Sequence, residues 1–197
     1  MKKIMFSDKF SLTALVLGGA KTQTRRIINA MPKEPRIAYG LEEEAGYVHL
    51  LNGYTVVAKS RYKIGEVVAV AQPYRYYDGK SDKYLNEWAK IVACDEMNGA
   101  GYNNKMFVRA ELMSHKIEIT DIRVQRLQDI SDDDCLAEGV IKYADGVYTY
   151  YENGKKYYHA NLDTPKKAYA ALIDQISGKG TWERNPFVYA YTFKLLQ

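Results

Sequence analysis

Four segments of the chain carry the pattern of a helix. The clearest is 164–180, which begins on Thr-Pro and has an apolar face made of Ala168, Leu172, Ile173 and Ile176. We also predict a helix from Ser7 or Asp8 to about Leu17, ended by two glycines, and another helix over 81–93. A short helix over 131–139 begins on a serine cap and has three aspartates in its first turn.

The strongest strand pattern lies at 115–130, where β-branched residues alternate with polar ones. The alternation breaks between Ile119 and Ile122, which predicts a β-bulge near Thr120 and Asp121. Asn-Gly pairs predict two hairpins, turning at Asn52-Gly53 and at Asn153-Gly154. The remaining predicted strands are 2–6, 22–27, 67–71 and 185–196.

Strands outnumber helices in this order, and most neighbouring strands can pair antiparallel. The pattern therefore predicts an α+β fold, a small and mostly antiparallel β-barrel with flanking helices and hairpin insertions. No linker divides the chain, so we expect one domain over 1–197.

Composition is that of an ordinary globular protein, with 47% hydrophobic and 26% charged residues in 197. The net charge of +4 permits nucleic-acid binding without requiring it. The 18 tyrosines favour half-buried strands, in runs such as YRYY, although their rings can also stack on bases.

Several classes of site and location are excluded. Cys94 and Cys135 form no CxxC pair and the three histidines lack ligand spacing, so we expect neither a metal site nor a cofactor. The start of the chain does not resemble a secretory signal, and no apolar run approaches ~18 residues, so we expect a cytoplasmic protein without membrane contact. The sequence leaves the oligomeric state open.

Candidate chemistry begins just after the first predicted helix, at Lys21. A lysine with a lowered pKa can act as a base toward a threonine hydroxyl, here that of Thr24. The two residues face opposite sides of an ideal strand, so they share a site only if Lys21 belongs to the preceding turn. The alternative is an exposed lysine beside a threonine-rich strand.

Glu138 breaks a local rule. It lies in the last turn of the helix predicted over 131–139, where the helix dipole disfavours a carboxylate by a few tenths to ~1 kcal/mol. Such exceptions are enriched at functional sites, although this helix is short enough for its dipole to matter little. Arg25 and Arg26 can reach phosphate oxygens, and Arg123 and Arg126 indicate either an RNA surface or a solvated strand face.

Several stretches resemble the ASCH family, whose members have a PUA-like β-barrel. LGGAKTQTRRI resembles the family's G-x-K-T-x-T-x-R signature after the first helix, and YKIGEVVAV resembles the strand that follows it. IEITDIRVQRLQDISDDDCLAEGV is similar to the family's long strand and short helix, and GKGTWERNPFVYAYTFKLL to the closing segment of a phage and prophage branch. Segments near 29–62, 75–105 and 143–162 then read as insertions.

The resemblance implies a cleft between the first helix and the barrel that binds RNA or a modified base. Some small bacterial members are amidohydrolases that deacetylate N4-acetylcytidine with a lysine, a threonine and a glutamate. These positions match the catalytic candidates Lys21, Thr24 and Glu138, with Thr22, Arg25 and Arg26 as ligand-binding candidates.

Three hypotheses for function follow. The first is a module that binds RNA or a modified nucleotide, and the second is an amidohydrolase acting on N4-acetylcytidine-like nucleosides. The third is a phage structural or interaction protein, with Tyr-rich hairpins as its contact surfaces. A binder would show steep salt dependence, a hydrolase would lose activity with Lys21→Ala, and a scaffold would lose its partner when the 146–160 hairpin is deleted.

Overall fold

A computed structural model describes residues 1–29, 41–44, 47–52, 55–77, 99–143, 146–157 and 162–196. The predicted helix over 81–93 lies outside these residues. Five strands form the central sheet, in the order β1-β6-β7-β11-β2. β1 pairs parallel with β6, and the other neighbours in the sheet pair antiparallel. The bounds are β1 Lys3–Ile4, β2 Gln23–Ile27, β6 Val67–Val70, β7 Lys116–Arg126 and β11 Phe187–Leu196.

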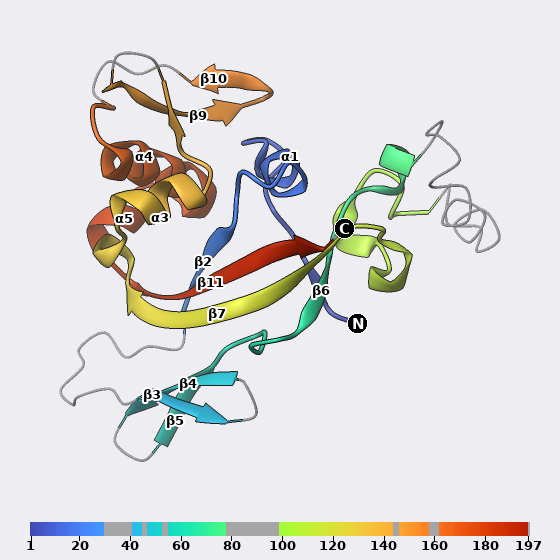
Figure 1. The fold of residues 1–197 in the computed structure, drawn as a ribbon, viewed down its shortest axis with the longest axis horizontal. Coiled ribbons are helices and arrows are strands. Elements are labelled where there is room, and N and C mark those ends of the chain that lie inside the picture. Colours follow the sequence, from blue (N-terminus) through green and yellow to red (C-terminus); the bar gives the residue numbers. More distant parts are fainter. Residues whose placement is uncertain are drawn as a thin grey trace.

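The two long strands β7 and β11 run side by side through the middle of the molecule (Figure 1). Thr192 pairs with Asp121 whereas Phe193 pairs with Ile119, so Thr120 is an extra residue in β7. The predicted bulge is therefore confirmed. Because of it, both Ile119 and Ile122 are buried, although an unbroken strand would place them on opposite faces.

The edges of this sheet, β1 and β2, approach each other without backbone pairing among the described residues. Arg26 of β2 instead donates from Nη2 to the carbonyl oxygen of Met5, directly after β1, at 2.6 Å. One side chain thus bridges a seam where a closed barrel would have a ladder of backbone bonds. The α+β class and the mostly antiparallel sheet are confirmed, and the described sheet is open at this seam.

Two smaller antiparallel sheets flank the central one. One consists of β3, β4 and β5, and the other of β8, β9 and β10. Both predicted hairpins form, between β4 and β5 and between β9 and β10. Asn153 and Gly154 have φ values of 50° and 75°, as a type I′ turn requires. The bounds are β3 Leu41–Glu44, β4 Tyr47–Asn52, β5 Thr55–Lys59, β8 Ile141–Lys142, β9 Tyr148–Glu152 and β10 Lys155–Tyr157.

The helices gather mainly at one end of the sheet (Figure 1). α3 and α4 have the predicted serine and threonine caps, since Ser131 accepts from the Asp134 amide and Thr164 from the Lys167 amide. Trp182 stands on α5, and its ring meets Tyr169 of α4 edge-on at 6.2 Å. The bounds are α1 Leu12–Leu17, α3 Asp132–Ala137, α4 Pro165–Ser177 and α5 Thr181–Arg184.

Two local predictions were wrong. The first helix was placed from Ser7 or Asp8, but Ser11 has φ 55°, a left-handed conformation that cannot lie inside an α-helix, so α1 starts at Leu12. The YRYY run forms a 3-10 turn and not a strand, because the Tyr76 amide bonds back to the Pro73 carbonyl. The 3-10 segments are η1 Tyr74–Tyr77, η4 Lys105–Phe107, η5 Ala110–Leu112 and η6 Leu127–Asp129.

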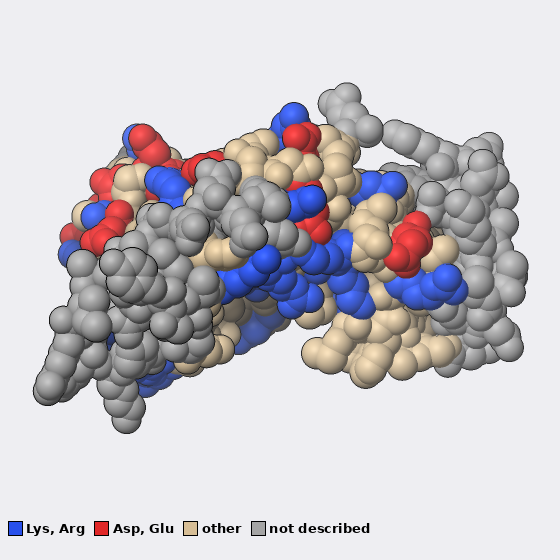
Figure 2. All heavy atoms as spheres, turned by 90° about the horizontal axis from the view of Figure 1, so that it is seen from below, with Lys and Arg blue, Asp and Glu red and all other residues tan. Residues whose placement is uncertain are grey.

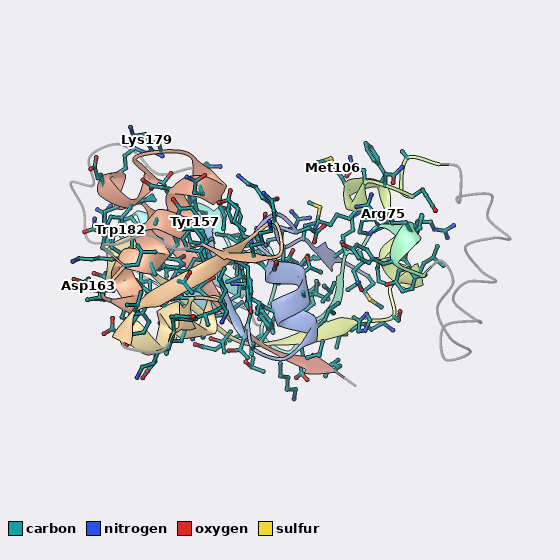
Figure 3. All side chains as sticks on the ribbon, turned by 90° about the horizontal axis from the view of Figure 1, so that it is seen from above. Arg75, Met106, Tyr157, Asp163, Lys179 and Trp182 are labelled. Atoms are coloured by element: carbon teal, nitrogen blue, oxygen red, sulfur yellow. The ribbon has the colours of Figure 1, made fainter. Side chains whose placement is uncertain are left out.

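Side chains from the central sheet, α1, α3 and α4 form the main core. A second cluster lies around η1 and η5. The labelled residues Trp182 of α5 and Arg75 of η1 lie toward opposite ends of the molecule in Figure 3. In the part of the chain that the structure describes, no helix is both long and apolar enough to cross a bilayer.

Candidate functional site

Lys21 lies in the turn between α1 and β2. Gly18 ends α1, the Lys21 amide bonds back to the Leu15 carbonyl, and β2 begins only at Gln23. This meets the condition set by the sequence, because a lysine in the turn can share a cavity with Thr24. The Lys21 side chain is only 1% exposed, so the alternative of an exposed lysine is wrong.

Glu138 is the C-cap residue of α3 and is almost completely buried. Lys21 Nζ donates to Glu138 Oε2 at 2.6 Å and to the Glu138 carbonyl oxygen at 2.6 Å. Arg25 Nη1 donates to the other carboxylate oxygen at 3.0 Å. Two cations therefore compensate a carboxylate that the helix dipole disfavours, and both carboxylate oxygens are engaged.

Arg25 holds this carboxylate against α3. Its guanidinium also donates to Asp134 Oδ2 at 2.6 Å and to Gln23 Oε1 at 3.2 Å. Gln23 in turn donates to Asp134 Oδ1 at 2.8 Å. The Arg25 side chain is fully buried, and its bond to Glu138 helps to hold that carboxylate in position.

The pKa of Lys21 is lowered from its ordinary value. Burial is the main cause, because it disfavours the charged ammonium. Glu138 opposes this effect, but Arg25 shares the same carboxylate and, with Arg26, repels the ammonium. A lowered pKa is what a lysine needs to accept a proton near neutral pH.

These residues line one cavity of about 320 Å³, here called the Lys21 cavity. Thr24 and Arg26 of β2 line it too, and α4 contributes Tyr169. Among the described residues, the buried Tyr169 hydroxyl has no hydrogen-bond partner. The full lining is Met5, Phe6, Ser7, Leu12, Lys21, Thr24, Arg25, Arg26, Ile27, Asn29, Glu138, Tyr169, Leu172, Ile173, Ile176 and Ser177.

The other singled-out residues lie outside this cavity. The Thr22 amide donates to the Ala137 carbonyl and its own carbonyl accepts from Phe193, so Thr22 ties the end of α3 to the sheet. Arg123 pairs with Asp121 and Asp134. Arg126 lies 3.9 Å from the centre of the Phe187 ring.

A second cavity, of about 530 Å³, lies next to the first and is here called the Arg61 cavity. It shares Met5, Arg26, Ile27 and Asn29 with the Lys21 cavity, and both lie along the open seam between β1 and β2. Sequence reasoning missed it, although the alternating tyrosines at 189 and 191 could have indicated it. The other lining residues are Lys3, Ile28, Ala58, Lys59, Arg61, Tyr62, Tyr189 and Tyr191.

The described residues contain no group of three or more His, Cys, Asp or Glu side chains able to hold a metal ion. His115 Nδ1 instead lies 2.9 Å from Gln72 Oε1. Cys135 is a buried free thiol whose pKa is raised to about 12, chiefly by burial. The polar side chains that line the Lys21 cavity are a lysine, two arginines, a carboxylate, an amide and several hydroxyls.

Comparison of the chain with family models, with curated proteins and with solved structures found no match. The resemblance to the ASCH family rests on the residues quoted above. The arguments for function start from the two cavities.

Proposed function

We propose that this chain binds a modified nucleobase or nucleoside in the Lys21 cavity. The observation that carries the proposal is that Glu138, distant in sequence, lines one cavity with Lys21 and Thr24. Its volume lies at the lower end of the usual range for small-molecule sites, which suits a small ligand. Apolar side chains, among them Leu12 and Ile173, alternate with a few polar groups that can fix a ring's orientation.

A PUA-like origin of the sheet is part of this proposal. The curved antiparallel sheet supports it, because its edges come within reach of one side chain at the seam. The Lys21 cavity takes residues from α1 and from the sheet edge, where the ASCH resemblance expects a cleft. The two cavities along the seam would then correspond to a binding groove in an opened barrel.

Hydrolysis of an exocyclic amide is the second candidate. Its specific support is the buried Lys21, whose pKa is lowered and whose ammonium position is set by Glu138. In its neutral form Lys21 accepts the Thr24 hydroxyl proton while Thr24 Oγ1 attacks the acetyl carbon. The C–N bond breaks, the proton passes to the leaving amine, and an acetyl ester remains on Thr24.

Water then completes the proposed reaction. Lys21 accepts a proton from a water molecule that attacks the ester carbonyl, and acetate leaves as the proton returns to Thr24 Oγ1. Glu138 acts by orienting Lys21, since its carboxylate accepts from both Lys21 and Arg25. Thr24→Val should abolish turnover, whereas Thr24→Ser should retain part of it.

The test measures binding and acetate release together, with N4-acetylcytidine as probe. Wild-type protein should bind the nucleoside in a calorimetric titration, and Lys21→Met should weaken this binding at least 10-fold. Acetate release by the wild type, lost in Lys21→Met, would establish hydrolysis. Binding without release would leave a binding module, and absence of binding would contradict both candidates.

A further inference from the structure

The Arg61 cavity is strongly basic. Four of its lining residues are cationic, Lys3, Arg26, Lys59 and Arg61, and no Asp or Glu lines it among the described residues. On the face of the molecule that carries β3–β5, Lys and Arg side chains gather in a band across the middle (Figure 2). A lining of this kind attracts an anion.

Two of these cations differ in how they are held. Lys3 Nζ donates to the Met106 and Val108 carbonyl oxygens, and burial and the nearby Arg61 lower its pKa. Arg61 is exposed, and its guanidinium lies 5.7 Å from the centre of the Tyr62 ring. A guanidinium at the mouth of a cavity suits bidentate contact with a phosphate group.

Three tyrosine rings form the wall of the same cavity. Tyr62 and Tyr191 meet edge-on at 5.3 Å, the Tyr62 hydroxyl donates to the Lys3 carbonyl, and the Tyr191 hydroxyl accepts from the Arg61 amide. Tyr189 is 6% exposed, and its buried hydroxyl has no partner within the described chain. A buried hydroxyl without a partner is costly, so it marks a group available to a ligand.

The two cavities lie on one continuous surface. Thr24 pairs with Tyr191 and Arg26 with Tyr189 across β2 and β11, and paired residues point to the same face. Thr24 lines the Lys21 cavity, the tyrosines line the Arg61 cavity, and Arg26 lines both. One ligand can therefore extend from the first cavity into the second.

We propose that the Arg61 cavity binds the nucleotide next to the modified base, so that the ligand is a single-stranded polynucleotide. Arg61 contacts the connecting phosphate, the neighbouring base lies in the cavity that the three tyrosines line, and the Tyr189 hydroxyl bonds to a polar edge of that base. This inference rests on the proposed function of the Lys21 cavity. It adds a second binding site and excludes the free nucleoside as the preferred ligand.

The test compares two probes, N4-acetylcytidine and a fluorescent uridine pentamer with N4-acetylcytidine at its centre. The pentamer should bind the wild type at least 10-fold more tightly than the nucleoside. Arg61→Ala should weaken the pentamer about 5- to 10-fold more than the nucleoside, and should reduce the salt slope of log K by about 0.7. Tyr189→Phe should weaken binding of the pentamer about 3-fold or more without lowering the stability of the protein. Loss of a hydroxyl that served only the fold would lower stability instead.

Arg75→Ala is the matched control. Arg75 is also exposed and lies 5.8 Å from a tyrosine ring, but toward the opposite end of the molecule from Trp182 (Figure 3). It should leave binding of the pentamer unchanged. Tight binding of either a ribose or a deoxyribose pentamer supports the proposal. The ratio of the two affinities shows whether the protein prefers RNA or DNA.

Three results would overturn it. Equal affinity for pentamer and nucleoside would remove the second site while leaving the proposed function intact. Equal binding of the matching duplex would also contradict it, because a base that is paired in a duplex cannot enter the cavity. If the wild-type protein binds neither probe, both this inference and the proposed function are contradicted.

Discussion

The two cavities along the seam differ in how their cationic side chains are compensated. In the Lys21 cavity, Lys21 and Arg25 are buried and share the carboxylate of Glu138. In the Arg61 cavity, the lining cations face no carboxylate among the described lining residues. The first arrangement holds side chains in fixed positions, as chemistry requires, and in the second the exposed guanidinium of Arg61 can attract an anion.

The largest effect should come from Glu138→Gln. The substitution leaves the buried Lys21 and Arg25 without their shared charge, and breaking such a pair costs about 3–5 kcal/mol. Urea unfolding measures the loss. Glu152→Gln is the control, because its partner Lys9 is half exposed and such pairs contribute about 0–1 kcal/mol. Equal losses in the two variants would contradict this account of the Lys21 cavity.

Lys21→Met should cost less than Glu138→Gln. Glu138 keeps Arg25 at 3.0 Å, so its carboxylate is not left without a cation. We expect a loss of about 1–3 kcal/mol, the range for removing one partner from a buried hydrogen bond. A loss as large as that of Glu138→Gln would show that Lys21, and not Arg25, compensates the carboxylate.

The sequence anticipated much of this site. The glycine stop before Lys21 and the unfavourable position of Glu138 singled out these two residues, and the structure brings them together. The sequence could not show that Arg25 would turn toward α3 while Arg26 turned toward Met5. Adjacent arginines look alike in sequence, and only the register of β2 against β11 decides which one is buried.

The fold could likewise be predicted where it depends on neighbouring residues and not where it depends on the whole sheet. The bulge at Thr120 and the hairpin at Asn153 could be predicted because each depends on a few neighbouring residues. The seam between β1 and β2 depends on the curvature of the whole sheet, and the local pattern carries no sign of it. The Arg61 cavity lies at that seam, and for this reason it was missed.

The lowered pKa of Lys21 predicts a pH dependence. A lysine whose pKa is lower in the folded than in the unfolded protein binds fewer protons when folded, so stability rises with pH between that lowered pKa and 10.5. The stability of the wild type relative to Lys21→Met should therefore increase toward pH 10, by at most about 1.4 kcal/mol per pH unit. Urea midpoints of both proteins at pH 7 and 9.5 measure the difference. Relative stability that does not change over this range would mean that Glu138 keeps the pKa of Lys21 at or above its ordinary value.

The smallest effects should separate two tyrosine hydroxyls, one in each cavity. Burial, with Glu138 nearby, raises the pKa of Tyr169 well above its usual value, so Tyr169 keeps a neutral hydroxyl, and that hydroxyl lacks a partner among the described residues. Tyr62 donates to the Lys3 carbonyl at 3.0 Å. Tyr169→Phe should therefore leave the unliganded protein unchanged or up to about 1 kcal/mol more stable, whereas Tyr62→Phe should lose about 0.5–1.5 kcal/mol. Tyr169→Phe should weaken binding of N4-acetylcytidine more than Tyr62→Phe does, because the Tyr169 hydroxyl lines the Lys21 cavity and has no partner among the described residues. If Tyr169→Phe destabilises the protein and binds the nucleoside as well as the wild type, that hydroxyl serves the fold and not the ligand.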